Sequence, residues 1–544
     1  MTMTSGDTRL TSWKSIARYF GKSERTVRRW EAEEGLPVQR HMHRSQGSVF
    51  AMESDLAAWQ KSRSEVSNAQ PLRDDRAETT SLIVMPLQFL GTNAAQDFLA
   101  VGFTDELISG LSRLDGLRVI SRTSSHALSA RSLSTAEIRK LVNADILIEG
   151  SIRQTGENLK ISVQMINCRT DQSSWSQTTT CDLDGIFDAQ AELVDAISKT
   201  LSHSMSNVTG DPQTVQRSRD RNIWEALVRA RIESLRWTPA AIRNAAGLLE
   251  ASIERYGDDP ALVSALGRCH LFLREIGSNM SNQPLDAAEE CLTLLRRSVP
   301  DEPATHQLAG WIAYQRGDIP AAMHSLRAAY IADADDPDTL ALLSYSYLLS
   351  GLDDLAHPIV DQLIAIDPLT PLNHSLAACK ELFAGRFDAA VESYAYMCNL
   401  DPSNKMAHLF HVMAMSISGE KQAVLKKVNE VAASFDTTPI DRLLHAFASG
   451  VRSEEIRSAP RIDMAMKATT VDMFPRLMAQ AHGLSGNKDA ALEWLSLAAD
   501  RGFRNWTFMT EIDPSLALLR EDEEFIRLMT RIKIDQQELR HQFS

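Results

Sequence analysis

Three arginines near the N-terminus, Arg25, Arg28 and Arg29, have the types and spacing best suited to a specific chemistry in this sequence. They fall within about one and a half turns of a predicted short helix and face away from its apolar side. A guanidinium group can pair bidentately with guanine in the major groove of DNA, and many other contacts go to phosphates. The pattern predicts a helix that binds double-stranded DNA.

The neighbouring residues predict a second helix and a turn that would position this basic helix. Ile16, Ala17 and Phe20 form one apolar stripe of a preceding helix, and Gly21 follows where a left-handed C-cap is needed. Ser23 can cap the next helix with its side-chain oxygen. Val27 and Trp30 supply the buried face of that helix. The positions left facing outward are Lys22, Glu24, Arg25, Thr26, Arg28 and Arg29.

The segment that follows is also patterned. A break at 35–38 precedes a basic run at 40–44, a turn into a short strand at 47–50, and a last helix opened by Asp55. This order, over about the first 63 residues, resembles the winged helix-turn-helix head of the MerR and excisionase class. The resemblance implies that the second helix enters the major groove and that the wing contacts phosphates. The DNA-binding residues expected on this basis are Lys22, Ser23, Arg25, Thr26, Arg28, Arg29, Arg40, His43 and Arg44.

The distribution of charge favours DNA over a protein partner for this head. Residues 1–63 hold 11 basic and 7 acidic residues, a net charge of +4, whereas the remaining chain carries −18. A small basic end on an acidic chain suits a confined nucleic-acid contact. Acidic residues at 31, 33 and 34 keep the basic surface local, and small helical heads also bind proteins. A head that binds protein is therefore the alternative.

Length and composition restrict the class of protein. A chain of 544 residues needs several domains, and 44% apolar with 24% charged residues is typical of globular protein. No apolar run approaches a membrane span and the first residues lack a signal peptide's apolar core, which predicts a cytoplasmic protein without membrane contact. The six cysteines have no paired spacing, so buried, reduced thiols are expected. Phosphate-loop, dinucleotide, zinc-protease and nucleophile-elbow motifs are absent, so neither a cofactor, a metal nor an enzyme is predicted.

Residues 81–202 mix strands with helices. A β-α-β start is expected from the apolar strand at 82–85, the helix at 98–114 and the strand at 117–120, and an antiparallel end from the hairpin turn at 155–158. The segments 102–107, 119–124 and 149–153 resemble the TolB amino-terminal-like module. That resemblance implies an α/β fold and no reaction.

Few residues of this module have the arrangement that catalysis would require. Asp105 and Glu106 are adjacent, so on a helix they point about 100° apart. Ser121, Ser124 and His126 could suggest a nucleophile, but the sequence indicates no third partner. Residues 121–125 are therefore predicted to be a strand-to-loop segment whose hydroxyls satisfy their own backbone.

A 34-residue repeat occupies the C-terminal half. Four glycines are spaced at this interval, and each is followed five residues later by a small residue: Gly317, Gly351, Gly385 and Gly419, with Ala322, Ala356, Ala390 and Val424. Asp-Pro pairs begin at 367 and 401, where a second helix should stop. This is the signature of tetratricopeptide (TPR) repeats, helical hairpins whose stacking makes a groove that usually takes a protein or peptide. A rigid spacer or a dimerisation surface is the other interpretation.

The predicted architecture is multidomain: a winged helix-turn-helix, an α/β module and an all-α TPR superhelix. The expected parts are a DNA-binding domain at 1–63, a linker at 64–80, an α/β domain at 81–202, a linker at 203–221 and a helical repeat domain at 222–544. The expected function is that of a bacterial-type transcription regulator, a homodimer whose array docks a protein or peptide. The alternative is a TPR scaffold whose head binds protein.

Overall fold

The computed structural model divides into two compact units, Met1–Ala77 and Glu78–Ser544. The structure describes residues 9–20, 27, 36–41, 48–52, 56, 79–91, 97–129, 131, 133–156, 158–205, 208, 220–236, 238–276 and 283–543.

The first unit combines a capped helix with a small antiparallel sheet. Its elements are β1 (Arg9–Leu10), α1 (Trp13–Tyr19), β2 (Gln39–His41) and β3 (Ser48–Met52), with β3 between β1 and β2. Ser12 and Ser15 form a capping box that satisfies the first amides of α1. The predicted helix and the predicted strand at 48–50 are both present.

The second unit begins with a six-stranded mixed sheet. Its strands are β4 (Thr80–Val84), β5 (Gln88–Leu90), β6 (Leu117–Val119), β7 (Ile146–Thr155), β8 (Asn158–Asn167) and β9 (Gln172–Asp182). The order is β6-β4-β7-β8-β9, with β5 also paired to β7. β4 runs parallel to β6 and β7, whereas β7, β8 and β9 form an antiparallel meander. The predicted β-α-β start and antiparallel end are confirmed.

Helices cover both faces of this sheet, as an α/β layer arrangement requires. The helices are α4 (Phe98–Leu111), α5 (Arg122–Ser129), α6 (Thr135–Val142) and α7 (Ile186–Ser204). On β4, Leu82 and Val84 point to the core under α4 and α7, while Ile83 points to the core under α5 and α6, because side chains of a strand alternate. Residues 122–129 form a helix where the sequence predicted a strand-to-loop segment.

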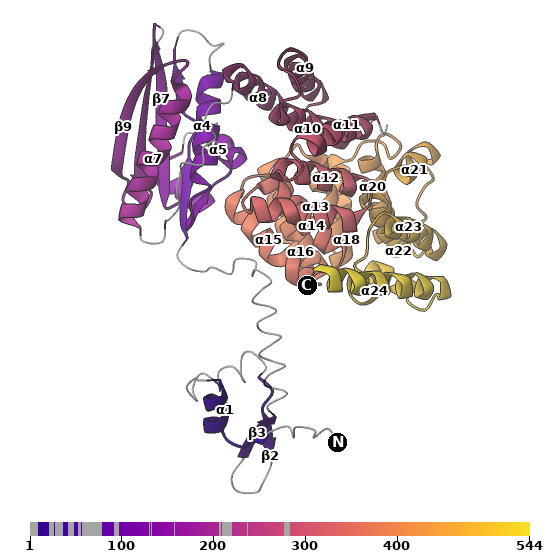
Figure 1. The fold of residues 1–544 in the computed structure, drawn as a ribbon. Coiled ribbons are helices and arrows are strands. Elements are labelled where there is room, and N and C mark those ends of the chain that lie inside the picture. The colour runs from indigo at the N-terminus through magenta and orange to yellow at the C-terminus, as the bar shows by residue number, and fades with distance from the viewer. Residues whose placement is uncertain are drawn as a thin grey trace. The chain divides into compact units, whose positions relative to one another are not determined.

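The rest of the second unit is a long run of helices (Figure 1). They are α8 (Arg221–Ser234), α9 (Pro239–Tyr256), α10 (Pro260–Ile276), α11 (Gln283–Ser298), α12 (Pro303–Gln315), α13 (Ile319–Ala332), α14 (Pro337–Leu349), α15 (Asp353–Ile366), α16 (Pro371–Phe383), α17 (Phe387–Leu400), α18 (Lys405–Ser418), α19 (Lys421–Val431), α20 (Pro439–Arg452), α21 (Pro460–Lys467), α22 (Met473–Ser485), α23 (Lys488–Asp500) and α24 (Glu523–Phe543). Two short turns of helix, η3 (Phe508–Ile512) and η4 (Pro514–Leu519), precede α24.

Four successive hairpins follow the predicted 34-residue period. α12 with α13, α14 with α15, α16 with α17 and α18 with α19 each reverse at a glycine that has a positive φ, between 64° and 90°. Only glycine adopts this conformation without strain. The small residues that follow these glycines are fully buried, which lets the paired helices approach closely. The central part of the array is therefore a TPR-type helical repeat.

The repeat loses its period after α19. The extended residues 453–459 separate α20 from the short α21, so the hairpin at α20 lacks the usual tight turn. The period returns at α22 and α23, which again reverse at a left-handed glycine, Gly486. This interruption matches the segment in which the sequence pattern was out of phase.

The C-terminal part of the chain contacts one rim of the array at the turns of Gly317, Gly351 and Gly385. At the turn of Gly351, the backbone amide of Arg504 donates to the carbonyl of Leu349 at 2.7 Å, and Gln536 Nε2 donates to the carbonyl of Gly351 at 3.0 Å. The side chain of Thr470 bonds at the turn before Gly317 in the same way. The chain's own C-terminal part thus contacts successive repeats along this rim.

The helices of the described ranges include none that is both long and apolar enough to span a bilayer. All six cysteines are free thiols, as predicted. Burial raises the pKa of Cys291 to about 11, which keeps this thiol protonated.

Candidate functional site

Most of the predicted DNA-binding residues lie outside the described part of the chain. These are Lys22, Ser23, Arg25, Thr26, Arg28, Arg29, His43 and Arg44. Of Arg40 only the backbone is described: it lies in β2, opposite Val49 of β3. The direction of the three arginine side chains, on which DNA binding depends, therefore stays a prediction.

The core that would support such a head is partly visible. Ile16, Val27, Leu36 and Leu56 are buried in one cluster, and Ala17 and Ala51 join them. Residues from α1, from the following segment, from the strands and from the last predicted helix thus share one small core. Val27 was expected to face inward and does so. A helix, a hairpin and a shared core are compatible with a winged head and do not by themselves define one.

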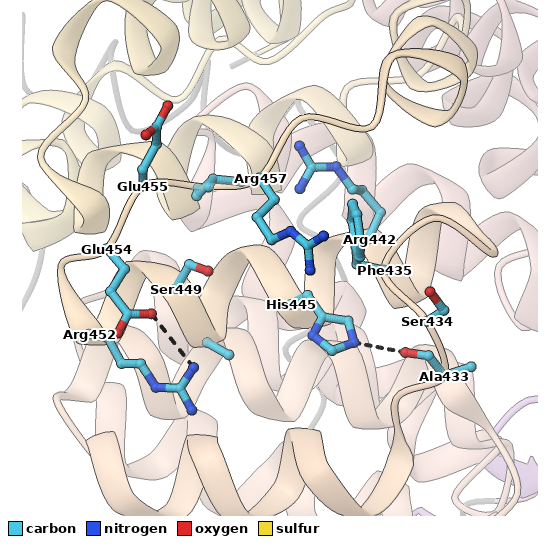
Figure 2. Close-up of a pocket in the computed structure, with 12 residues that line it drawn as sticks. Ala433, Ser434, Phe435, Arg442, His445, Ser449, Arg452, Glu454, Glu455 and Arg457 are labelled. Atoms are coloured by element: carbon cyan, nitrogen blue, oxygen red, sulfur yellow. Dashed lines mark hydrogen bonds and ion pairs between the residues drawn. The ribbon is translucent and has the colours of Figure 1, made fainter.

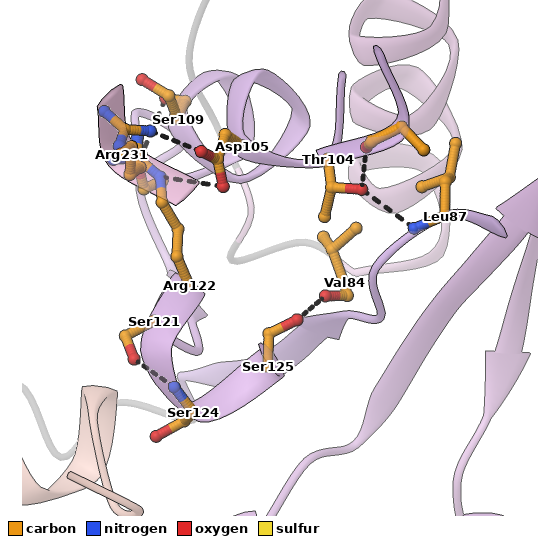
Figure 3. A network of polar contacts seen from close by, with 12 residues as sticks. Val84, Leu87, Thr104, Asp105, Ser109, Ser121, Arg122, Ser124, Ser125 and Arg231 are labelled. Atoms are coloured by element: carbon orange, nitrogen blue, oxygen red, sulfur yellow. Dashed lines mark hydrogen bonds and ion pairs between the residues drawn. The ribbon is translucent and has the colours of Figure 1, made fainter. Parts of the chain in front are cut away.

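The polar residues singled out in the α/β module hold the fold together (Figure 3). The carboxylate of Asp105, only 3% exposed, lies 2.5 Å from Arg231 Nη1 of α8 and 3.8 Å from Arg122 Nε. Ser125 donates to the carbonyl of Val84 at the end of β4. Burial lowers the pKa of His126, which favours the neutral imidazole. The Asp105 and Ser125 side chains thus connect α4 to α8 and the start of α5 to the end of β4.

Helix α8 belongs to two cores at once. Trp224 and Val228 are buried in the core of the α/β module, where Trp224 packs against Phe98 and Phe187. Ala230, which follows Val228 by two residues and so lies on another face of α8, is buried against α9 and α10. The linker predicted at 203–221 overlaps the last two residues of α7 and the first residue of α8, and α8 also completes the core of the module.

A pocket of about 610 Å³ lies where the repeat is interrupted (Figure 2). Its wall is one face of α20, and its two sides are the extended segments before and after this helix. The residues that line it are Ala433, Ser434, Phe435, Arg442, His445, Ala448, Ser449, Arg452, Glu454, Glu455, Ile456 and Arg457. This volume is within the usual range for ligand sites in proteins.

The polar groups of this pocket are held in defined positions. Arg442 makes two bonds to Asp463, at 2.8 and 3.2 Å, and the guanidinium of Arg452 lies 3.7 Å from Glu454. A ring nitrogen of His445 is 2.7 Å from the carbonyl of Ala433. These pairs neutralise two of the three arginines.

Among the described residues Arg457 is the pocket arginine without an ion pair within 4 Å, and the exposed carboxylate of Asp436 interacts with its charge from a longer distance. Its guanidinium stacks over the Phe435 ring at 4.3 Å, and the described residues place no carboxylate within 4 Å of it. The side chain of Glu455 points away from it in Figure 2. A flat cationic surface beside an imidazole and an aromatic ring can bind an acidic or aromatic side chain.

No motif in the sequence predicted this pocket. Its residues come from two extended segments and one helix face, and the spacing has no repeat-type pattern. The only available signal was the loss of the 34-residue period between 425 and 475. In an array of regular hairpins, such a loss marks a place where backbone leaves the helices and a pocket can form.

The helices, strands and turns described above thus define an N-terminal α/β region followed by a TPR-type array. No known family profile matches the chain. A protein of Rhizobium meliloti (strain 1021) with the name Putative adenylate cyclase 3 is 25% identical over 185 residues, which are 34% of this chain and 31% of that protein. The chain therefore spans about a third of this relative's length.

Among solved structures, a TPR protein from Thermus thermophilus is 19% identical with a TM-score of 0.29, covering 35% of this chain and 98% of its own. Yeast Tom70 is 12% identical with a TM-score of 0.32, covering 89% of this chain and 88% of its own. At such scores the assignment of the array depends on its own helices, turns and period.

Proposed function

We propose that this protein is an interaction scaffold whose helical array binds a protein or peptide partner. The observation that supports it best is the pocket beside α20, which interrupts an otherwise closely packed array. The turns of Gly317, Gly351 and Gly385 are already covered by the C-terminal part of the chain. A partner is therefore expected at the interruption, and the groove predicted from the repeat pattern is only partly available.

The chemistry of the pocket suggests which side chains of a partner would enter it. The exposed guanidinium of Arg457 favours a carboxylate, and the ring of Phe435 offers an apolar surface next to it. A segment that presents an acidic residue beside an apolar or aromatic one would satisfy both. Such anchors usually supply most of the affinity of an interface.

Peptides selected by display against the full-length chain would test this proposal. Selected sequences should be enriched in acidic and aromatic residues, and their affinity is measured by fluorescence anisotropy. Phe435→Ala and Arg457→Glu should each weaken binding by about 30-fold, the effect of losing a strong anchor. Arg461→Glu, an exposed arginine outside the pocket, is the matched control. Equal affinities for all three variants would reject the pocket as the binding site.

DNA binding by the N-terminal unit is the second candidate function. It is favoured by the capped α1, the β2–β3 hairpin and the shared core, together with the net positive charge of residues 1–63. On this proposal the array would couple a partner to gene control, and the active form would be a homodimer that binds two half-sites.

A salt series with the full-length chain tests this second proposal. Binding to genomic fragments should weaken steeply as salt rises, and selected fragments should share a sequence. Changing Arg25, Arg28 and Arg29 to Ala should abolish that enrichment, whereas Arg18→Ala on the exposed side of α1 should preserve it. Identical selection by both variants would refute the assignment of these arginines.

A further inference from the structure

The strand order of the α/β module contains a reversal of the kind at which open α/β sheets commonly bind ligands. β4 leads through α4 to β6 on one face, and β6 leads through α5 and α6 to β7 on the other face, with β4 between β6 and β7. The strand order reverses at this point. In open α/β sheets, ligands bind at the carboxyl ends of the strands where such a reversal occurs.

Three serines after β6 line this position. Ser121 caps α5, because its hydroxyl accepts the backbone amide of Ser124 at 3.0 Å (Figure 3). Ser125 bonds to the last residue of β4, so the start of α5 is fixed between the two strand ends. All three side chains are buried. Hydroxyl groups at the first turn of a helix are suitable donors for a negatively charged ligand.

A carboxylate from the helical array already occupies this position. Oδ1 of Asp367, in the loop between α15 and α16, accepts the hydroxyl of Ser121 at 2.5 Å and that of Ser124 at 2.6 Å. Its other oxygen accepts Asn373 Nδ2 at 2.8 Å. Asp367 is 3% exposed. Among the described residues no lysine or arginine pairs with it, so neutral donors hold this charge.

Two backbone bonds and one apolar side chain complete the contact. The amide of Ser121 donates to the carbonyl of Ile366 at 2.8 Å, and the amide of Leu369 donates to the hydroxyl of Ser124 at 3.0 Å. Leu369 itself is buried among residues of the module, including Ile120. Residues separated by about 245 positions in the chain are therefore in specific, dry contact.

We infer that this reversal point of the module is a carboxylate-binding site and that Asp367 of the array is its resident ligand. The module recognises one loop of the array by the same chemistry with which such positions in other sheets hold free anions. The equivalent residue one repeat further on, Asp401, bonds instead to its neighbour Ser403. Recognition is thus specific to one repeat, and it fixes where the module sits along the array.

Chemical rescue with acetate tests this inference on the full-length chain. Asp367→Ala removes the ligand and leaves a space for a small carboxylate. Hydrogen exchange of peptides covering 117–131 and 362–372 should increase by about tenfold or more, since a hydrogen bond to a charged group is worth roughly 1.5–3 kcal/mol. Sodium acetate, compared with sodium chloride at equal ionic strength, should restore the protection in this variant.

Three controls make the outcome decisive. Asp401→Ala should leave exchange at 117–131 unchanged with or without acetate. The double variant Ser121→Ala/Ser124→Ala should lose protection as Asp367→Ala does, but acetate should not restore it, because the donors are gone. Unchanged exchange in β8 and β9 shows that the sheet stays folded. The inference is overturned if Asp367→Ala exchanges like the parent chain, or if acetate and chloride act alike on it.

Discussion

A buried ion pair at the start of α22, which also contacts α14 in the centre of the array, allows a quantitative prediction. Arg476 Nε donates to Asp472 Oδ2 at 2.9 Å, and its Nη2 donates to the hydroxyl of Tyr345 on α14 at 3.3 Å. The side chains of Asp472 and Arg476 are 1% and 4% exposed. The guanidinium also lies 5.3 Å from the centroid of Phe503. Burial raises the pKa of Asp472, and the charge and hydrogen bond of Arg476 act in the opposite direction.

Arg476→Met keeps most of the volume and removes the positive charge. Asp472 must then remain charged without a partner or take up a proton. Protonating a carboxyl of ordinary pKa 3.8 costs about 1.4 kcal/mol for each pH unit above that value. The part of the stability loss that comes from the unpaired charge is therefore limited to about 4 kcal/mol at pH 7 and about 2 kcal/mol at pH 5. The lost contacts with Tyr345 and Phe503 add a cost that does not depend on pH in this range. Since the pKa of Asp472 is raised in the folded protein, stability is retained at low pH and lost as pH rises.

Hydrogen exchange of the amides of α22, corrected for the intrinsic rate at each pH, gives the local free energy of opening. The difference between the parent chain and Arg476→Met should be about 2–3 kcal/mol larger at pH 7 than at pH 5. The double variant Asp472→Asn/Arg476→Met has no charge to bury and should show no such pH dependence. Equal losses at pH 5 and pH 7 would refute the reasoning, because they would mean that packing and not charge sets the cost.

Three further predictions concern packing and protonation. Gly102→Ala should destabilise the contact between α4 and α8 by about 1–3 kcal/mol, because its new Cβ would lie 2.3 Å from Trp224 Cζ2, and tryptophan fluorescence on heating would report it. Gly247→Ala, with nothing within 4 Å of the new Cβ, should instead stabilise α9 by up to about 1 kcal/mol in urea unfolding. Burial lowers the pKa of His482 to about 4, so the folded chain should lose stability as pH falls below 6.5, and His482→Gln should recover about 2 kcal/mol of it at pH 5 in the same assay.

The sequence predicted the repeated hairpins well because their constraints are local. A glycine with positive φ, a buried alanine five residues later and a proline at the next helix start each act within a few residues of themselves. Large apolar residues within these repeats fill the space between helices, and the following four are buried: Leu326, Tyr347, Val360 and Tyr394.

Contacts between distant segments could not be predicted in this way. Asp367 was expected only to end a helix, and it does follow α15, but its carboxylate is bound by serines about 245 residues earlier. The serines themselves were predicted to satisfy their own backbone. Ser121 does so in part, as the cap of α5, and its second bond depends on where the fold brings the array. No pattern within either segment carries that information.

The pocket beside α20 was missed for a similar reason. Phe435 and Arg457 lie in separate extended segments, and only the packing of both against α20 brings them together. Arg25, Arg28 and Arg29 are the opposite case, since their spacing is a strong local signal that no described contact yet tests.

The C-terminal part of the chain changes how a solenoid of this kind must unfold. In an open repeat array each hairpin touches only its neighbours, so ends can fray while the middle persists. Here Asn505 and Gln536 bond to the turn around Gly351, in the middle of the array, and the ring of Phe508 packs against Phe383 one repeat further on. Losing the contacts of the C-terminal part would therefore destabilise the central hairpins as well as the end of the array. Inserting or deleting one repeat would shift the C-terminal part relative to the turns that it contacts. We therefore expect this array to unfold cooperatively, and its number of repeats to be fixed by the contacts with the C-terminal part.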